Sequence, residues 1–266
     1  MRKIFLIVLV LSETLNAGFE KTGIGARSAA MSNALVGKAD DVWAIYSNVG
    51  GLKQLKNYQA SFFYSPQPFG MHELSESAIA AAVPFNFGVL GFGIRRYGFE
   101  LYRELSWTLS YANSVKGICL GVNFNFHTVT IKNYGSANTI GIDVGMLVPV
   151  FINFQFGTFI KNINSPTIGV SREKLPQSFT TGVAYIPMNS LTLTLDIEKE
   201  INFDLNARFG FEYWIIDALV LRGGATDTPT QFSGGVGVRY SIFQMDYGFT
   251  THQELGCTHG ISITIQ

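Results

Sequence analysis

One stretch of the sequence decides the fold class: FDLNARFGFEY, residues 203–213. Its odd-numbered positions are all apolar or aromatic, from Phe203 to Tyr213, whereas the positions between them hold Asp204, Asn206, Arg208, Gly210 and Glu212. A β-strand repeats every two residues, so this segment has one apolar face and one largely polar face. The same alternation recurs along nearly every segment after residue 55. This pattern favours a wall between lipid and a wet lumen. A secreted β-sandwich is the alternative, because alternation alone does not say which face contacts water.

Charged residues are scarce in this chain. They make up 14% of the 266 residues, against about 25% in a typical soluble domain, while apolar residues make up 47%. The formal net charge is +0, so nucleic acid is not expected as a partner. The 28 glycines suit tight turns and a crowded barrel interior.

The N-terminus has the pattern of a secretory signal peptide, which we place at residues 1–17. Arg2 and Lys3 precede an apolar core from Ile4 to Leu11, which is too short to cross a bilayer as a helix. No later stretch approaches about 18 uninterrupted apolar residues. An exported chain with a lipid-compatible face and no membrane helix is expected in the bacterial outer membrane.

Residues 18–57 differ from the rest of the chain and predict a small plug, or hatch, ahead of a barrel at residues 58–266. Short helical turns are suggested by a run of small and apolar residues: Ala29, Ala30, Met31, Ala34, Leu35 and Val36. Asp40 or Asp41 is expected to cap a second turn from Trp43 to Tyr46. The alternative is a flexible exported N-terminus.

The remaining sequence predicts an all-β fold, a transmembrane antiparallel barrel of about 14 strands. The expected strands are 58–65, 77–84, 88–97, 102–112, 117–128, 139–149, 151–161, 177–186, 191–199, 203–213, 218–225, 231–240, 241–249 and 258–265. Short connections alternate with longer ones such as 66–76, 129–138 and 162–176, as periplasmic turns and extracellular loops do in such barrels. Cys119 and Cys257 fall near opposite ends, so no disulfide between them is expected.

Charged residues gather on the inward faces of the last strands. The cluster consists of Asp196, Glu198, Asp204, Arg208, Glu212, Arg222, Arg239 and Asp246. Neighbouring strands lie about 4.8 Å apart, so opposite charges there can pair across the wall. Two interpretations are open: a polar lining that anchors the plug or guides a passenger, or ion pairs that neutralise one another inside the barrel.

Motifs of catalysis, cofactor binding and metal binding are absent from the sequence. Gly23-Ile24-Gly25 lacks the third glycine and the preceding strand of a dinucleotide site, and there is no nucleophile elbow or phosphate-binding loop. His72, His127, His252 and His259 are scattered without metal-ligand spacing. We therefore predict no catalytic residues, no cofactor and no metal, and a protein that is not an enzyme.

Two stretches resemble a known family. The first is Gly25-Ala26-Arg27 followed by Met31, Ala34, Asp40-Asp41, Ala44, Tyr46, Asn48 and Gly51-Leu52. The second is Leu221-Arg222-Gly223-Gly224, Phe232-Ser233-Gly234-Gly235-Val236-Gly237, Asp246-Tyr247 and His259-Gly260-Ile261-Ser262. They are similar to the PorV/PorQ group and, more distantly, to FadL-type fatty-acid transporters. The family's usual Asn-Pro-Ala-Gly-Leu reads Asn48-Val49-Gly50-Gly51-Leu52 here, without the proline and alanine.

The resemblance implies a FadL-like barrel of fourteen strands with an N-terminal plug. It also implies that Arg27, Asp40, Asp41 and Asn48 hold the plug in place, with Arg222 and Asp246 as the expected partners on the barrel.

Three functions are compatible with this architecture. The resemblance favours a PorV/PorQ-type barrel that assists export or surface handover of proteins, as in type IX secretion, with exported proteins or secretion components as partners. The second is a FadL-like channel for small hydrophobic compounds, in which the plug shifts and the ligand leaves sideways or downward. The third is a structural or adhesive barrel whose loops 66–76 and 162–176 contact partners. All three place the wall in contact with outer-membrane lipid.

Overall fold

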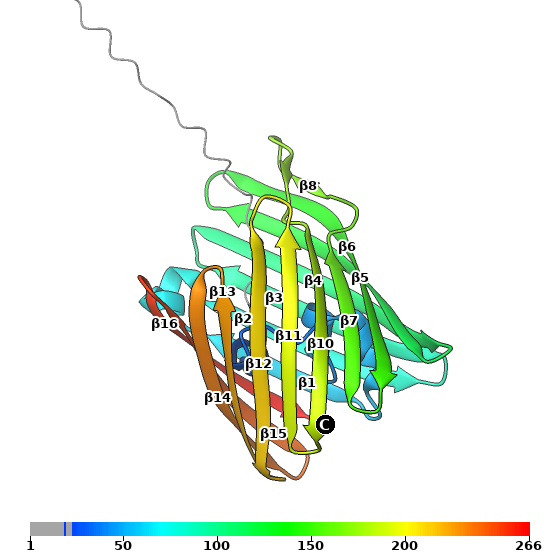
Figure 1. Ribbon diagram of the computed structural model, residues 1–266. Helices are drawn as coiled ribbons and strands as arrows, with labels where there is room; N and C mark the ends of the chain where they lie inside the picture. Colours follow the sequence, from blue (N-terminus) through cyan, green and yellow to red (C-terminus); the bar gives the residue numbers. More distant parts are fainter. Residues whose placement is uncertain (1–18, 20–22) are drawn as a thin grey trace, which may run out of the picture.

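A computed structural model describes residue 19 and residues 23–266 of the chain, so the expected signal peptide at 1–17 lies outside the described residues. Fourteen antiparallel strands form a closed barrel (Figure 1). They are β1 (Gln59–Ser65), β2 (Glu76–Phe85), β3 (Gly88–Gly98), β4 (Tyr102–Val115), β5 (Ile118–Ile131), β6 (Gly135–Phe151), β7 (Phe154–Lys161), β10 (Ser178–Met188), β11 (Leu191–Glu200), β12 (Leu205–Ile216), β13 (Leu219–Asp227), β14 (Thr230–Tyr240), β15 (Phe243–His252) and β16 (Gly256–Ile265). Each strand pairs with its neighbours in sequence order, and β1 closes the barrel against β16. The predicted fold class and strand number are confirmed.

The two ends of the barrel differ in their connections. At one end every strand pair is joined by two residues: 86–87, 116–117, 152–153, 189–190, 217–218 and 241–242. We call this the turn end. The opposite end, called the loop end here, carries the long connections 66–75 and 162–177 together with shorter ones. The second long connection contains a small sheet of its own, β8 (Thr167–Ile168) paired with β9 (Glu173–Lys174).

Two predicted boundaries are wrong. The expected loop 129–138 is mostly strand, because β5 and β6 continue pairing as far as Ile131 and Gly135. Strand β12, the tenth of the barrel, begins at Leu205, two residues later than predicted, because 201–204 form the turn after β11. In that turn the Lys199 ammonium donates a hydrogen bond to the Phe203 carbonyl oxygen.

The barrel wall is apolar outside and polar inside. On β16, Ile261, Ile263 and Ile265 are 37–47% exposed, whereas Ser262 between them is 1% exposed. On β5, Phe124 and Phe126 likewise face out, while Asn123, Asn125 and His127 are buried in the lumen. Apolar side chains on an outer face with no protein partner suit contact with lipid, and this architecture is typical of bacterial outer-membrane proteins.

The described part of the N-terminal segment lies inside the barrel and forms the plug. It contains two short helices, α1 (Ala26–Ala30) and α2 (Ala44–Ser47), and a 3-10 helix, η1 (Val49–Gln54). The predicted helical turns from Ala29 to Val36 are misplaced, because α1 begins earlier and ends at Ala30. The second predicted turn is close to α2, and Asp41 precedes it with its carboxylate accepting a hydrogen bond from the Trp43 amide.

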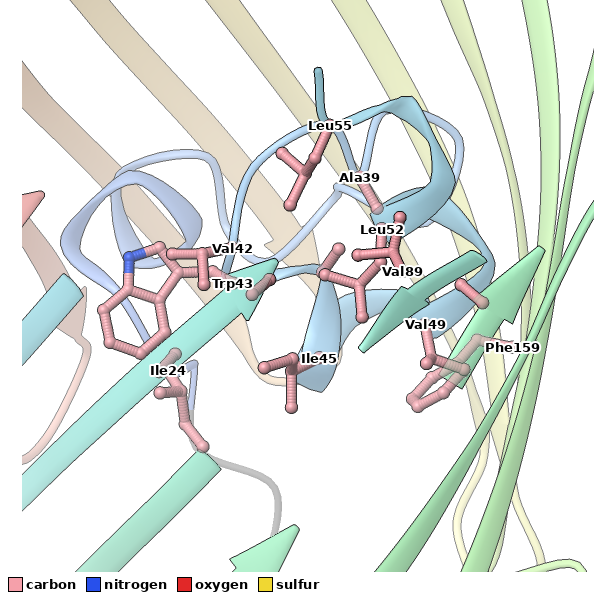
Figure 2. Packing of buried hydrophobic residues seen from close by; sticks show 14 of the residues in the cluster. Ile24, Ala39, Val42, Trp43, Ile45, Val49, Leu52, Leu55, Val89 and Phe159 are labelled. Carbon is pink, nitrogen blue, oxygen red and sulfur yellow. The ribbon is translucent and has the colours of Figure 1, made fainter. Parts of the chain in front are cut away.

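The plug packs against the wall through apolar side chains and through direct contacts between the two backbones. Figure 2 shows Ile45, Val49 and Leu52 of the plug beside Val89 and Phe159 of the barrel. Elsewhere the wall supplies inward-facing glycines, where the two backbones touch. A Cβ atom added to Gly121 would lie 2.6 Å from the Val49 carbonyl, and one added to Gly224 would lie 2.6 Å from the Met31 carbonyl carbon. Such contacts leave no room for a wall side chain.

The two cysteines are both free. Cys119 lies at the turn end on β5 and is half-buried, and Cys257 lies at the loop end on β16 and is exposed. Across the described residues, no helix is long and apolar enough to cross a membrane.

Candidate functional site

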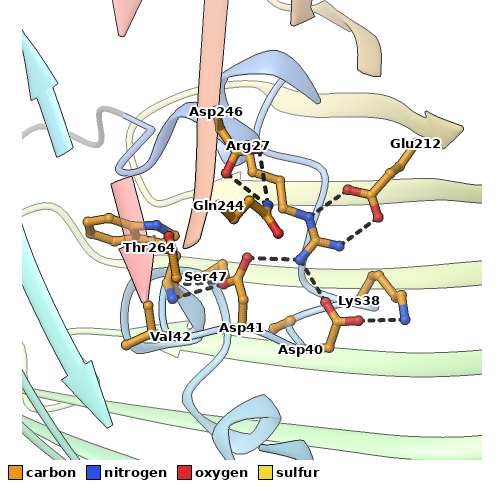
Figure 3. Close-up of polar contacts among 12 residues, drawn as sticks. Arg27, Lys38, Asp40, Asp41, Val42, Ser47, Glu212, Gln244, Asp246 and Thr264 are labelled. Carbon is orange, nitrogen blue, oxygen red and sulfur yellow. Dashed lines mark hydrogen bonds and ion pairs between the residues drawn. The ribbon is translucent and has the colours of Figure 1, made fainter. Parts of the chain in front are cut away.

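A chain of buried charges joins the plug to the barrel at its centre. The Arg27 guanidinium on α1 donates hydrogen bonds to both Glu212 carboxylate oxygens on β12, at 2.8 and 3.1 Å. It also donates to the plug carboxylates Asp40 at 2.7 Å and Asp41 at 2.8 Å (Figure 3). A single guanidinium therefore bridges two turns of the plug and one strand of the wall, which suits its planar set of five donors.

The chain of charges continues along the wall. Arg222 on β13 lies opposite Glu212 in the strand register and donates to the same carboxylate at 2.7 Å. Arg222 also donates to Asp246 on β15 at 2.6 Å. The expectation that Arg222 and Asp246 contact the plug directly is wrong, because Glu212 lies between Arg222 and Arg27 and bridges the two guanidiniums.

The two plug carboxylates differ in acidity. Burial raises the pKa of Asp40, but the charges of Arg27 and Lys38 lower it by more, and the net pKa lies well below the usual range. Burial raises the pKa of Asp41 as well, Arg27 lowers it in part, and the charge on Asp40 raises it again, so this pKa lies above the usual value. Asp41 therefore loses its charge before Asp40 when the pH falls.

Two further polar contacts join the plug to the wall. Asn48, fully buried, donates from its amide to the carbonyl oxygens of Val36 at 2.8 Å and of Met146 on β6 at 2.9 Å. The Val36 amide in turn donates to the Asp196 carboxylate on β11 at 2.8 Å. Asn48 thus ties two plug segments and one strand together, and Asp196 uses its lumen position to bind plug backbone.

The charged residues of the predicted lumen cluster have different partners. Glu212 and Asp196 contact the plug, while Glu198 pairs with Arg208 across the wall at 2.8 Å. Asp204 is exposed in the turn before β12, so its assignment to the lumen is wrong. Arg239 is half-buried, with its guanidinium 4.3 Å from the centre of the Trp214 ring.

Among the described residues, two cavities lie on opposite sides of the plug. The cavity at the turn end has a volume of about 290 Å³ and is lined by polar and charged side chains, including Arg27, Asp40, Arg222, Arg239 and Gln244. The cavity on the loop side of the plug, the inner cavity, measures about 60 Å³. Its apolar lining comes from Phe19, Ile24, Val36, Ile45 and Phe159.

An apolar groove lies outside the inner cavity at the loop end. It has a volume of about 530 Å³ and is lined by side chains of β5, β6 and β8, among them Val129, Ile131, Ala137 and Ile168. Phe19 lines both this groove and the inner cavity, and its ring is 3% exposed. The groove and the cavity are therefore neighbours, and Phe19 lies at their boundary.

Some of the polar residues beside the inner cavity were missed by sequence reasoning. Arg95 on β3 donates to Glu76 on β2 at 2.6 Å and lies 3.9 Å from Glu104 on β4. Asp143 on β6 accepts hydrogen bonds from Asn123 and Asn125. Inward parity on these strands is the signal that could have identified them, since each alternates with outward apolar neighbours.

The part of the chain that the structure describes holds no group of three or more His, Cys, Asp or Glu placed to bind a metal ion.

Comparison with solved structures identifies the fold of this chain. The toluene transporter TodX of Pseudomonas putida superposes with a TM-score of 0.70 and 10% identity, covering 92% of this chain and 98% of that one. A FadL homologue of Pseudomonas aeruginosa gives 0.67 and 11% identity over 94% and 99%. The fold is FadL-like. The toluene transporter TbuX of Ralstonia pickettii gives 0.66 and 13% identity over 92% and 98%.

Sequence comparison adds no family to this result. No protein-family model matches the chain, and no curated protein matches it. At 10–13% identity the structural similarity shows the FadL-like fold alone. This fold and its apolar outer face support the predicted location in the bacterial outer membrane.

Proposed function

We propose that this FadL-like barrel is a channel that carries small hydrophobic compounds through the outer membrane. The observation that supports it most is the apolar groove at the loop end, which shares Phe19 with an inner cavity that has an apolar lining. The structural neighbours named as toluene transporters share the fold and nearly the full length of this chain. No catalytic function is proposed.

The plug is closed in this state. An apolar cavity of about 150 Å³ can hold benzene, whereas the inner cavity measures about 60 Å³. A compound moving inward from the groove must therefore displace Phe19 or widen the cavity. The backbone contacts between plug and wall favour a local movement of this kind over expulsion of the whole plug.

Arg27, Asp40, Asp41 and Asn48 are proposed to hold the plug during transport, as the resemblance implies. The contacts of Arg27 with Glu212 and of Asn48 with Met146 support this role, because each joins the plug to a barrel strand. Asp40 and Asp41 act through Arg27.

The export role implied by the PorV/PorQ resemblance has weaker support. The structural neighbours reported above are described as transporters or a FadL homologue, and none of these three as a secretion component. The adhesive barrel also stays a prediction, because no contact of the long loops with a partner supports it.

Uptake measurements with a groove variant test the channel. Ile168 on β8 is 6% exposed and lines the groove, so Ile168→Ser makes the groove more polar. Cells expressing this variant should take up toluene more slowly than cells expressing the unchanged chain. Thr167→Ser alters the exposed neighbour on the same short strand and serves as the matched control.

For each protein, a heat-dependent shift in electrophoretic mobility verifies that the barrel is folded in the outer membrane. Equal uptake rates for Ile168→Ser and the unchanged chain, at equal amounts of folded protein, would show that the groove is not part of the transport path.

A further inference from the structure

The inner cavity is more polar than a pure hydrocarbon would require. Three buried polar atoms of its lining have no hydrogen-bond partner in the described part of the chain: the Tyr46 hydroxyl, His127 Nε2 and Asn162 Oδ1. A buried polar atom without a partner costs about 1–3 kcal/mol. Three such atoms around one small cavity indicate a polar occupant, either water or a polar group of a ligand.

The orientation of the Asn162 amide is fixed by its other contacts. Its side-chain nitrogen donates to the Pro176 carbonyl oxygen at 2.7 Å, and its backbone amide donates to the Asp143 carboxylate at 2.9 Å. Because a carbonyl oxygen can only accept, the amide cannot be flipped, and Oδ1 must be the atom that faces the cavity. The occupant must therefore bring a hydrogen-bond donor.

His127 Nε2 and Asn162 Oδ1 both lie over the inward face of Gly141 on β6. The other ring nitrogen of His127 is hydrogen-bonded to the Ser106 hydroxyl at 2.7 Å. A Cβ atom added to Gly141 on β6 would contact Asn162 Oδ1 and lie 3.1 Å from His127 Nε2. Glycine at position 141 thus leaves both atoms free to receive the same small group.

An aromatic ring already fits against this polar site. The Phe19 ring lies 4.7 Å from the His127 ring, centre to centre, at an interplanar angle of 53°. Ile24, Ile45 and Phe159 supply the apolar remainder of the lining. A ligand ring that displaced Phe19 would find the same surroundings, with its polar substituent toward Asn162.

The charges around the cavity disfavour an anionic substituent. Three carboxylates lie in or next to the lining, those of Glu76, Glu104 and Asp143, against the two cations Arg95 and Lys161. A carboxylate cannot donate to Asn162 Oδ1, whereas a hydroxyl group can donate to that atom.

We propose that the inner cavity recognises the hydroxyl group of small phenol-like aromatic compounds, with the ring in the place of Phe19. This inference rests on the proposed channel function and narrows its substrate class from small hydrophobic compounds to hydroxylated aromatics. Asn162 Oδ1 accepts the hydroxyl proton, and His127 Nε2 beside it forms the second hydrogen bond. The Tyr46 hydroxyl lies beside Gly93 on β3, three strands away from Gly141, and does not reach the same group.

Equilibrium binding of two nearly isosteric probes tests this assignment. The affinities of 4-fluorophenol and 4-fluorotoluene for the full chain in lipid nanodiscs are measured by fluorine NMR, with empty nanodiscs to correct for partition into lipid. The two probes differ in a hydroxyl and a methyl group. One or two added hydrogen bonds should favour the phenol roughly threefold to tenfold. A third probe, 4-fluorobenzoate, should bind more weakly than the phenol.

One substitution should remove the preference while leaving toluene binding in place. Gly141→Ala places a methyl group against Asn162 and His127. Tyr64→Phe deletes a hydroxyl from the outer face of β1, where Tyr64 is 45% exposed, and should leave the preference unchanged. A heat-dependent mobility shift verifies the fold of each variant.

Equal affinities for phenol and toluene would overturn the assignment and show that water satisfies the three atoms. Tightest binding of the benzoate would overturn it too, in favour of an anion site, as would an unchanged preference in Gly141→Ala. Because binding is measured without transport, a failure here is separable from a failure of uptake in cells.

Discussion

Removal of the Arg27 charge should loosen the plug more than any other single change in the buried charge network. In Arg27→Met the side-chain volume is largely kept, but three carboxylates lose a hydrogen-bonded cation. Glu212 keeps Arg222 at 2.7 Å and Asp40 keeps Lys38 at 2.7 Å. Among the described residues Asp41 keeps no ion pair and is left with the hydrogen bond from the Trp43 amide.

The size of the effect follows from these remaining contacts. Removal of one partner from a buried ion pair costs about 3–5 kcal/mol. The lower end applies, because two of the three carboxylates keep a cation and the Asp40 and Asp41 side chains are 28% and 23% exposed. A loss of about 3 kcal/mol corresponds to a change of roughly 150-fold in the opening equilibrium of the plug.

Hydrogen exchange of plug amides measures this opening directly. The Trp43 and Asn48 amides are bonded within the plug, so their exchange should accelerate by about two orders of magnitude while barrel amides stay protected. Lys38→Met is the matched control, since Lys38 pairs with Asp40 alone and Asp40 retains Arg27. It should change exchange less than about fivefold, as expected for a contribution below about 1 kcal/mol.

Equal plug exchange in Arg27→Met and the unchanged chain, with a folded barrel, would refute the reasoning. It would mean that apolar packing and backbone contacts hold the plug without the charge network.

Three further substitutions have defined outcomes. Asp41→Ala removes the acceptor of Arg27 and of the Trp43 amide and should raise protease sensitivity near residues 40–50; an unchanged digestion pattern would count against the anchor. Asn48→Ala leaves two buried carbonyl oxygens without their donor and should lower the free energy of unfolding by about 2–4 kcal/mol, measured by denaturant titration in detergent. Gly121→Ala pushes the plug backbone at Val49 and should cost about 1–3 kcal/mol in the same titration. This cost should exceed that of Gly234→Ala, whose new methyl group has its closest contacts with the Phe249 side chain and no backbone atom nearer than 3.7 Å; equal effects would contradict the backbone contact.

The sequence was sufficient to predict the wall of the barrel. Alternation from Leu205 to Tyr213 and from Ile118 to Phe126 specifies both the strand and the face that points outward, because a slip of one residue would turn charges toward lipid. Alternation was less informative at strand ends. Phe203 continues the apolar parity of β12 but lies in a turn, and Val129 to Ile131 were expected in a loop although they pair in β5.

The plug contacts could be predicted only in part. The family resemblance pointed to Arg27 and Asn48, and both do contact barrel strands. Their partners depend on three-dimensional register that one-dimensional parity does not contain. Asp196 lies opposite Arg208 in the sheet, yet its carboxylate accepts the Val36 amide, while Arg208 turns diagonally to Glu198. The packing of the plug decides which lumen charges remain for pairing across the wall.

The inner cavity was not predictable from sequence. Phe19 and Tyr46 come from the N-terminal segment, His127 from β5 and Asn162 from the connection directly after β7, and no spacing between them carries a signal. They meet because α2 and η1 of the plug pack against the side of the barrel formed by β3 to β6.

The initial rate of toluene uptake is the most direct test of the proposed channel. It is compared between outer-membrane-bearing cells that express the full chain and the same cells without it, after a heat-dependent mobility shift has shown a folded barrel in the membrane fraction. The account predicts a faster initial rate that increases with the amount of folded barrel. Equal rates with and without the barrel would contradict it.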